Sequence, residues 1–328
     1  MDIKGQIIKY CADLGLDLIG FTPCREFSEL RKFYNYRKDE GLENEFEEVD
    51  IEKRINPNHY MQEGKTIISI AFPYLHDGVY NSNGFSLYTR GLDYHRVVKS
   101  YLDKICEFIE KIGGKAMSFV DSNTLPERYI AYLSGIGFIG KNNMLITKKY
   151  GSFVFLGEII TDLDIDTRDI KQLDNTPCKE CNRCYTACPT NSINDKKKNC
   201  NICMSYITQK KEINDKYLYL MKGRIFGCDT CQNSCPCNKD IAYSGINEFK
   251  PLDFMNDNIC TESILSLTNS KFKETFKTTS CGWRGKNILI RNSLIKMYLI
   301  ENKNIEDYSF ESPYLEEYKN RLLLLNKV

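Results

Sequence analysis

The clearest chemical signal in the sequence is a run of cysteines in its second half. Their spacing, C-x2-C-x2-C-x3-C-P, is that of the bacterial ferredoxin run, which binds 4Fe-4S clusters. A zinc site generally uses two ligand pairs separated by a longer loop, so zinc is the weaker interpretation of such closely nested thiolates. The run consists of Cys178, Cys181, Cys184, Cys188 and Pro189.

A second run, from Cys228 to Cys235, repeats the later part of this spacing, but Ile225 stands where its first cysteine is expected. A distant ligand must replace it, and either Cys200 or Cys203, in the intervening loop, could supply it. In two-cluster ferredoxins the last cysteine of each run binds the other cluster. One cluster is therefore expected on Cys178, Cys181, Cys184 and Cys235, and the other on Cys188, Cys228, Cys231 and one of the loop pair.

Two neighbouring clusters predict a protein that moves electrons, because thiolates stabilise iron in both oxidation states and clusters relay single electrons. The chain has 15 cysteines and no export signal, so we expect a cytoplasmic location, where disulfides are rare. We interpret the cysteines outside the motifs as small, buried apolar residues. These are Cys11, Cys24, Cys106, Cys237, Cys260 and Cys281.

The composition fits a soluble protein with a sizeable core, since 42% of the 328 residues are hydrophobic. The longest apolar stretches, Thr66 to Tyr74 and Phe153 to Ile160, are shorter than the roughly 20 residues that cross a bilayer. We therefore expect no membrane association. The net charge of +1 excludes neither a nucleic acid nor a small molecule as substrate.

Hydrophobic periodicity predicts an α/β domain in residues 1–165. Over residues 166–250 the periodicity fades, so we expect a ferredoxin-like domain organised by metal rather than by an apolar core. Residues 251–328 are expected to form a short helical segment. Helices are expected over residues 3–14, 94–112, 126–134, 287–301 and 314–325. Strands are expected over residues 17–22, 66–74 and 117–120, with residues 144–146 and 152–162 as paired strands.

Several short motifs occur together with the cysteine runs, and their joint order is more specific than any one of them. They are Leu92-Asp93-Tyr94-His95, Asp121-Ser122, Gly135-Ile136-Gly137-Phe138-Ile139-Gly140-Lys141-Asn142, Cys203-Met204-Ser205-Tyr206 and Gly227-Cys228-Asp229-Thr230-Cys231. With these motifs the chain resembles the epoxyqueuosine reductase (QueG) family. The chain departs from the family at Phe138 and Cys237, where tryptophan is usual, and in its short C-terminal segment.

The resemblance implies a cobalamin-dependent oxidoreductase that reduces the epoxide of epoxyqueuosine in the wobble position of tRNA, the last step of queuosine biosynthesis. It implies that the N-terminal α/β domain binds cobalamin and that the two 4Fe-4S clusters feed electrons to its cobalt. An external one-electron donor, such as a flavodoxin or ferredoxin system, would supply them. It also implies Cys203, rather than Cys200, as the eighth cluster ligand. We expect a monomer.

Asp121 is the candidate catalytic residue, because the resemblance implies that it acts as proton donor. Opening an epoxide to leave an alkene takes two electrons and a proton for the leaving oxygen. A carboxylic acid beside an apolar corrin face would have a raised pKa and could supply that proton. The alternative is a structural one, since an aspartate after a strand commonly caps a turn or a helix.

The other candidate cofactor contacts follow from motif position under the same resemblance. They are Arg54, Tyr88, Asp93, Tyr94, His95, Ser122, Gly140, Lys141 and Asn142. The glycines of the 135–140 run would let the backbone approach the corrin, although a glycine-rich turn explains them equally. His95 also suits a structural role at a helix start.

Lys210 and Lys211 are the candidate contacts to tRNA, with Tyr206, Tyr217 and Tyr219 nearby to stack on unpaired bases. A solvated basic loop is the alternative. Two other functions also fit the sequence: a corrinoid and iron–sulfur reductase of a small molecule such as an organohalide, and a two-cluster electron carrier without a substrate of its own.

Overall fold

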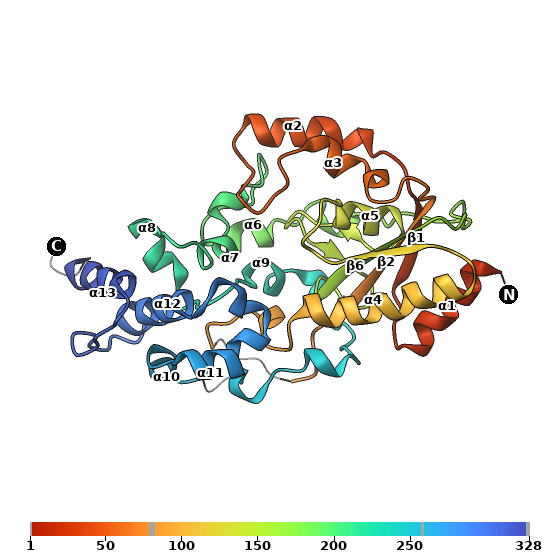
Figure 1. Ribbon diagram of the computed structural model, residues 1–328. Coiled ribbons are helices and arrows are strands. Elements are labelled where there is room, and N and C mark those ends of the chain that lie inside the picture. The colour runs from red at the N-terminus through yellow and green to blue at the C-terminus, as the bar shows by residue number, and fades with distance from the viewer. Residues whose placement is uncertain (1, 79–82, 257–258, 326–328) are drawn as a thin grey trace.

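The computed structural model describes residues 2–78, 83–256 and 259–325. A four-stranded antiparallel sheet lies at the centre of the N-terminal part (Figure 1). Every residue of its second strand is buried, as expected where both faces of a sheet are covered. In spatial order the strands are β1 (Ile19–Pro23), β2 (Thr66–Pro73), β6 (Val154–Thr161) and β3 (Ala116–Phe119).

Helices cover both faces of this sheet. α4 (Tyr94–Lys111) packs on one face together with α1 (Ile3–Asp13), and α5 (Glu127–Leu133) packs on the other. α2 (Arg31–Asp39) and α3 (Ile51–Ile55) form a further layer outside α5 (Figure 1). α4 buries an apolar stripe at helical spacing that includes Val98, Leu102, Ile105 and Ile109, and this stripe fixes the helix against the sheet.

The elements expected in the first 165 residues are confirmed close to their expected bounds, but one strand pairing was wrong. β5 (Leu145–Ile146) pairs with β4 (Phe138–Ile139), and not with β6. A tight turn closed by the Gly140 amide and the Met144 carbonyl, 2.9 Å apart, returns the chain onto the glycine run. The apolar β6 is taken instead into the sheet between β2 and β3.

The second half of the chain is helical, as Figure 1 shows. Its helices are α6 (Arg183–Ala187), α7 (Met204–Ile207), α8 (Asp215–Leu218), α9 (Thr230–Asn233), α10 (Thr261–Leu265), α11 (Asn269–Glu274), α12 (Lys286–Leu299) and α13 (Pro313–Leu325). The expected helices over residues 287–301 and 314–325 are therefore confirmed. So is the expected fold class, a mixed helix and sheet structure.

One apolar core joins residues 204–226 to the C-terminal helices. Ile207 and Phe226 pack in it beside Leu289 and Leu294 of α12. The expectation that metal rather than an apolar core organises residues 166–250 was therefore wrong for this stretch, whose apolar side chains lie too far apart in sequence to show one clear period. The bounds of the three expected domains stay a prediction.

The cysteines outside the cluster motifs differ in their burial. Cys11, Cys106 and Cys281 are buried, and Cys24 is partly buried. Cys260 is exposed, so its predicted burial was wrong; it precedes α10 at the surface, where its thiol donates a 2.8 Å hydrogen bond to Glu262. Within the described part of the chain, no helix is long and apolar enough to cross a membrane.

Candidate active site and cluster sites

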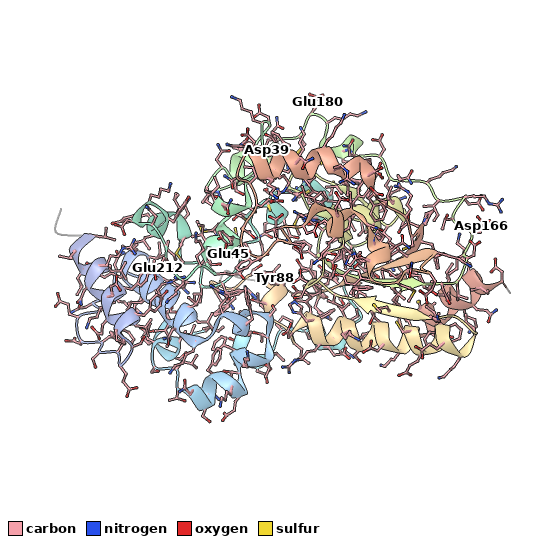
Figure 2. The ribbon with its side chains drawn as sticks, turned by 45° about the horizontal axis from the view of Figure 1, so that its top comes forward. Asp39, Glu45, Tyr88, Asp166, Glu180 and Glu212 are labelled. Carbon is pink, nitrogen blue, oxygen red and sulfur yellow. The ribbon has the colours of Figure 1, made fainter. Side chains whose placement is uncertain are left out.

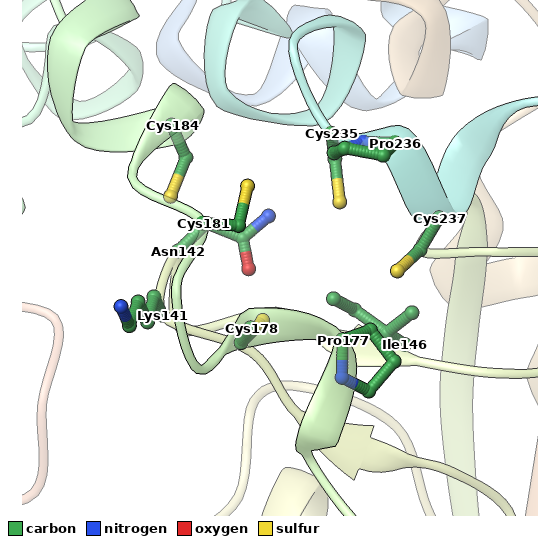
Figure 3. Close-up of a pocket in the computed structure, with 10 residues that line it drawn as sticks. All are labelled: Lys141, Asn142, Ile146, Pro177, Cys178, Cys181, Cys184, Cys235, Pro236 and Cys237. Carbon is green, nitrogen blue, oxygen red and sulfur yellow. The ribbon is translucent and has the colours of Figure 1, made fainter.

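The four cysteines expected to hold the first cluster line one cavity (Figure 3). Cys178 and Cys181 lie in the loop before α6, Cys184 lies in α6, and Cys235 follows α9, which packs against α6. Four thiols around one cavity suit a cluster of several iron atoms, because each thiolate meets a different iron. The structure therefore brings together a ligand set drawn from both cysteine runs, as the spacing predicts.

The four other ligand candidates also lie near one another. Burial raises the pKa of the Cys231 thiol, and negative charge on Cys203, Cys228 and Cys188 raises it further. Cys200 faces elsewhere, since its thiol donates to the Leu42 carbonyl at 2.9 Å and to the Glu47 carboxylate at 3.1 Å. This arrangement favours Cys203 over Cys200 as the eighth ligand.

Asp121 follows β3 and points toward the start of α4. Its Oδ2 accepts hydrogen bonds from the Tyr94 hydroxyl at 2.7 Å and from Nε2 of His95 at 3.0 Å. Nδ1 of His95 contacts Asp93 at 2.8 Å. Pro126, and not Asp121, occupies the N-cap position of α5. The carboxylate therefore faces side chains of α4, which argues against the capping alternative.

The expected raised pKa of Asp121 is not found in this structure. Burial alone would raise the pKa, but the hydrogen bonds from His95 and Tyr94 outweigh it and lower the pKa of Asp121. Burial likewise opposes the charge on His95, but hydrogen bonds to Asp121 and Asp93 raise the pKa of His95 to about 9. At neutral pH the proton is thus on the imidazole of His95, beside an ionised Asp121.

Two further acidic residues support this site, and sequence reasoning missed both. Oε1 of Glu127 accepts hydrogen bonds of 2.8 Å from the backbone amide of Asp121 and from the side-chain amide of Asn123. Glu158 lies fully buried on β6, where its Oε2 has no hydrogen-bond partner. Burial raises the pKa of both carboxyls, and negative charge on Asp121 and Glu127 adds to the respective shifts. The signal in the sequence was an acidic residue, Glu158, inside an apolar strand.

The site around Asp121 is recessed in the protein and still open. Surrounding protein atoms tend to raise the pKa of Asp121 by burial, and yet 57% of its side chain is exposed to solvent. Burial also raises the pKa of Tyr88 and lowers that of Arg128, although Tyr88 is only partly buried and the Arg128 side chain is exposed. Figure 2 shows Tyr88 between the sheet-bearing part and the C-terminal helices. Arg128, which sequence reasoning missed, thus adds a positive charge near Asp121.

The remaining cofactor candidates occupy different positions. Arg54 is 12% exposed and pairs with Glu43 and Glu47, with its guanidinium 3.8 Å from the ring centroid of Tyr34. These contacts give Arg54 a structural role between α2 and α3. Ser122 is exposed beside Asp121, where it is free to meet a ligand.

The end of the glycine run meets the first cluster cavity, which Lys141 and Asn142 line (Figure 3). The Lys141 ammonium donates to the Lys179 carbonyl at 2.9 Å, and so fixes the loop that carries Cys178. A Cβ atom on Gly140 would lie 2.5 Å from Cδ1 of Ile146 and 2.8 Å from Oδ1 of Asn142, so these side chains would have to shift to admit one. Nδ2 of Asn142 is buried without a partner.

Lys210 and Lys211 lie on the far side of the molecule from α1, after α7. Their backbone carbonyls accept hydrogen bonds of 2.6 and 2.8 Å from the buried Arg291 of α12. Lys211 is exposed, whereas Lys210 is half-buried with its ammonium 5.2 Å from the ring centroid of Tyr206. Tyr206 is 6% exposed and its hydroxyl donates to Glu45. The expectation of base stacking was therefore wrong for Tyr206, because this ring belongs to the core. Tyr217 is partly buried and Tyr219 is 53% exposed, and their stacking on bases stays a prediction.

Comparison with known proteins identifies the family to which the chain belongs. The family model described as "Epoxyqueuosine reductase QueG, DUF1730" matches residues 54–122, and a 4Fe-4S double cluster binding domain matches residues 177–238. The epoxyqueuosine reductase of Lactococcus garvieae (strain Lg2) is 36% identical, over 88% of this chain and 85% of that protein. The enzyme of the same name from Bacillus subtilis (strain 168) is 34% identical, over 90% and 78%.

Solved structures of epoxyqueuosine reductases have a similar fold. A crystal structure of epoxyqueuosine reductase with a tRNA-Tyr epoxyqueuosine-modified stem loop has a TM-score of 0.90 at 30% identity, covering 98% of this chain and 89% of that chain. The structure of the enzyme from Streptococcus thermophilus has a TM-score of 0.82 at 31% identity and covers both chains completely. The chain belongs to the epoxyqueuosine reductase family and is an oxidoreductase.

Proposed function

We propose that this chain reduces epoxyqueuosine to queuosine in the wobble position of tRNA, with cobalamin bound beside Asp121 and two 4Fe-4S clusters as the electron supply. The observation that carries the proposal is the recessed, open position of Asp121, hydrogen-bonded to Tyr94 and His95. It gives a redox protein of this family a proton source at a site that a substrate can reach.

Removing the epoxide oxygen as water and leaving a carbon–carbon double bond consumes two electrons and two protons. Bound cobalamin supplies the metal centre that passes electrons to the substrate. The chain supplies the protons and holds the reactants in place.

The residues around Asp121 have distinct parts in this proposal. Protonated His95 gives its proton to Oδ2 of Asp121, 3.0 Å away, and Asp121 passes it to the leaving oxygen. Solvent then reprotonates His95, and the same path delivers the second proton. The hydroxyl of Tyr94 fixes the carboxylate in place. Asp93 keeps His95 charged through its 2.8 Å contact with Nδ1.

The described side chains fit the implied cofactors. The thiols of the first cavity supply the soft ligands that iron–sulfur clusters need. Nδ2 of Asn142 is a buried donor without a protein partner, and a ligand acceptor would satisfy it. Tyr88 and Ser122 lie where they could line the edge of a site for a large flat cofactor near Asp121.

The proposed substrate is tRNA rather than a small molecule. Lys210 and Lys211 would meet its phosphate backbone. A relative that was solved with an epoxyqueuosine-modified tRNA stem loop has the same fold, at a TM-score of 0.90, which supports a tRNA substrate. An external one-electron donor, such as a flavodoxin or ferredoxin system, would refill the clusters in the cytoplasm, and the enzyme would act as a monomer.

The test is product analysis after anaerobic reconstitution with iron, sulfide and cobalamin. The reconstituted protein is incubated with a chemical reductant and epoxyqueuosine-containing tRNA, and the nucleosides are identified by mass spectrometry. Queuosine is expected only when cobalamin was present. Cobalamin-independent queuosine formation, or none from a protein that holds both metals, would refute the proposal.

A further inference from the structure

Cys237 lines the same cavity as the four cysteines expected to bind the first cluster. Figure 3 shows its sulfur directed into the space that the sulfur of Cys235 also enters, on the side opposite Cys184. Neither spacing motif includes Cys237. The cavity therefore holds one thiol more than a 4Fe-4S cluster needs.

The local backbone explains why two cysteines of this segment reach one cavity. Residues Pro236–Asn238 form a 3-10 turn that begins after Cys235, and the Asn238 amide donates to the Cys235 carbonyl at 3.1 Å. The turn places the thiols of Cys235 and Cys237 at the same cavity.

This turn is held firmly against the sheet-bearing part of the protein. Oδ1 of Asn238 accepts from the Ser152 amide at 2.8 Å, and Nδ2 donates to the Gln232 carbonyl at 2.8 Å. A Cβ atom added to Gly151 would lie 3.1 Å from the Cys237 carbonyl oxygen. The backbone of Cys237 is thus packed in place, so its direction toward the cavity belongs to the fold.

The Cys200 thiol has different contacts from the Cys237 thiol. It is also partly buried and also lies near the cluster segment, but its thiol is engaged by Leu42 and Glu47 of the N-terminal part. The Cys237 thiol instead has other cysteines of the cavity as its neighbours. A thiolate among thiolates, on a rigid turn at a cluster cavity, has the chemistry of a ligand.

We propose that Cys237 is an alternative ligand of the first cluster, able to bind the iron that Cys235 otherwise binds. In the exchange the bond from iron to the Cys235 sulfur breaks and a bond to the Cys237 sulfur forms. The proton of the Cys237 thiol passes to the Cys235 thiolate, and the oxidation state of the iron does not change. The inference rests on the two clusters of the proposed function and assigns this chain a fifth thiol for one of them.

The test compares three variants of the full chain after anaerobic reconstitution: Cys235→Ala, Cys237→Ala and Cys235→Ala/Cys237→Ala. Iron per chain and the EPR spectrum of the reduced protein are measured, and neither readout depends on substrate or cobalamin. Wild type is expected to hold about eight irons. Both single variants should keep this iron content, and the double variant should lose iron from the first cluster.

Two controls keep the result interpretable. Cys231→Ala removes a ligand from the other site and should lose iron without rescue. In the double variant the signal of the other cluster should persist, which shows that the chain still folds. If Cys235→Ala alone loses as much iron as the double variant, Cys237 is not a ligand, and the proposed function stands. If wild type binds no iron, the proposed function itself fails.

Discussion

His95 and Asp121 form an ion pair in which Nε2 of the imidazole lies 3.0 Å from Oδ2 of the carboxylate. The two residues come from different elements, the first turn of α4 and the loop after β3. A catalytic acid is expected to have a raised pKa, but this pair lowers the pKa of Asp121 and raises the pKa of His95 to about 9. The stored proton thus lies on the histidine at neutral pH.

The pH dependence of the reaction should report His95. A group whose pKa is raised to about 9 keeps its proton below that value and loses it as the pH rises through it. We expect kcat/KM to be level from neutral pH to about 8 and to fall about tenfold for each further pH unit above 9.

The Asp93→Asn variant should shift this alkaline limb to lower pH, because the Asp93 carboxylate contributes to the raised pKa of His95. The His95→Gln variant should lose the limb and show a lower rate throughout. An unchanged alkaline limb in His95→Gln would assign the titration to another group.

Glu127 should act as a positioning residue for Asp121. Its Oε1 accepts a hydrogen bond from the backbone amide of Asp121. The φ of Asp121 is +50°, which is unusual for a residue other than glycine. Glu127→Ala removes this acceptor, so we expect kcat to fall by up to about 100-fold through misplacement of the carboxylate.

Glu127→Gln separates positioning from charge, since a glutamine oxygen accepts the same hydrogen bonds. We expect this variant to recover most of kcat, with KM for tRNA unchanged in both variants. Equal activity of Glu127→Ala and wild type would show that the loop holds its shape without this contact.

Lys210 and Lys211 should contact phosphates of the tRNA. Replacing both with alanine should weaken tRNA binding at low salt and reduce the slope of log affinity against log salt by about 2, or about 1 for each lysine. Fluorescence anisotropy with a labelled anticodon stem loop measures both quantities.

Lys303→Ala is a matched control for this experiment, because Lys303 pairs with Glu301 at 3.3 Å and should leave the slope unchanged. If the double variant has the wild-type slope, these lysines belong to a solvated loop and another surface binds the tRNA.

The sequence predicted those parts of the site that depend on local spacing. The cysteine spacing predicted a ligand set drawn from both runs, and Cys178 and Cys235 indeed meet at one cavity. The apolar stripe of α4 predicted the helix that presents Tyr94 and His95. Each of these patterns repeats at intervals of a few residues, so each can be recognised within a short stretch of the sequence.

The parts that sequence reasoning missed depend on contacts between distant segments. Glu127 matters because it reaches the backbone of the loop after β3, and Glu158 because it lies in the covered centre of the sheet. The pKa of Asp121 was expected to be raised because its neighbours were unknown; the hydrogen bonds from α4 reverse the effect of burial. Such effects appear only when the tertiary structure is known.

The most direct test of the account is the rate of queuosine formation by Asp121→Asn, measured in a single turnover with epoxyqueuosine-containing tRNA. Asparagine keeps the size of the side chain and an oxygen for Tyr94, but it cannot take up the proton of His95 and pass it on. With iron and cobalt contents matched to wild type, the account predicts a rate at least about 100-fold lower. A rate equal to that of wild type would contradict it and remove Asp121 from the chemistry.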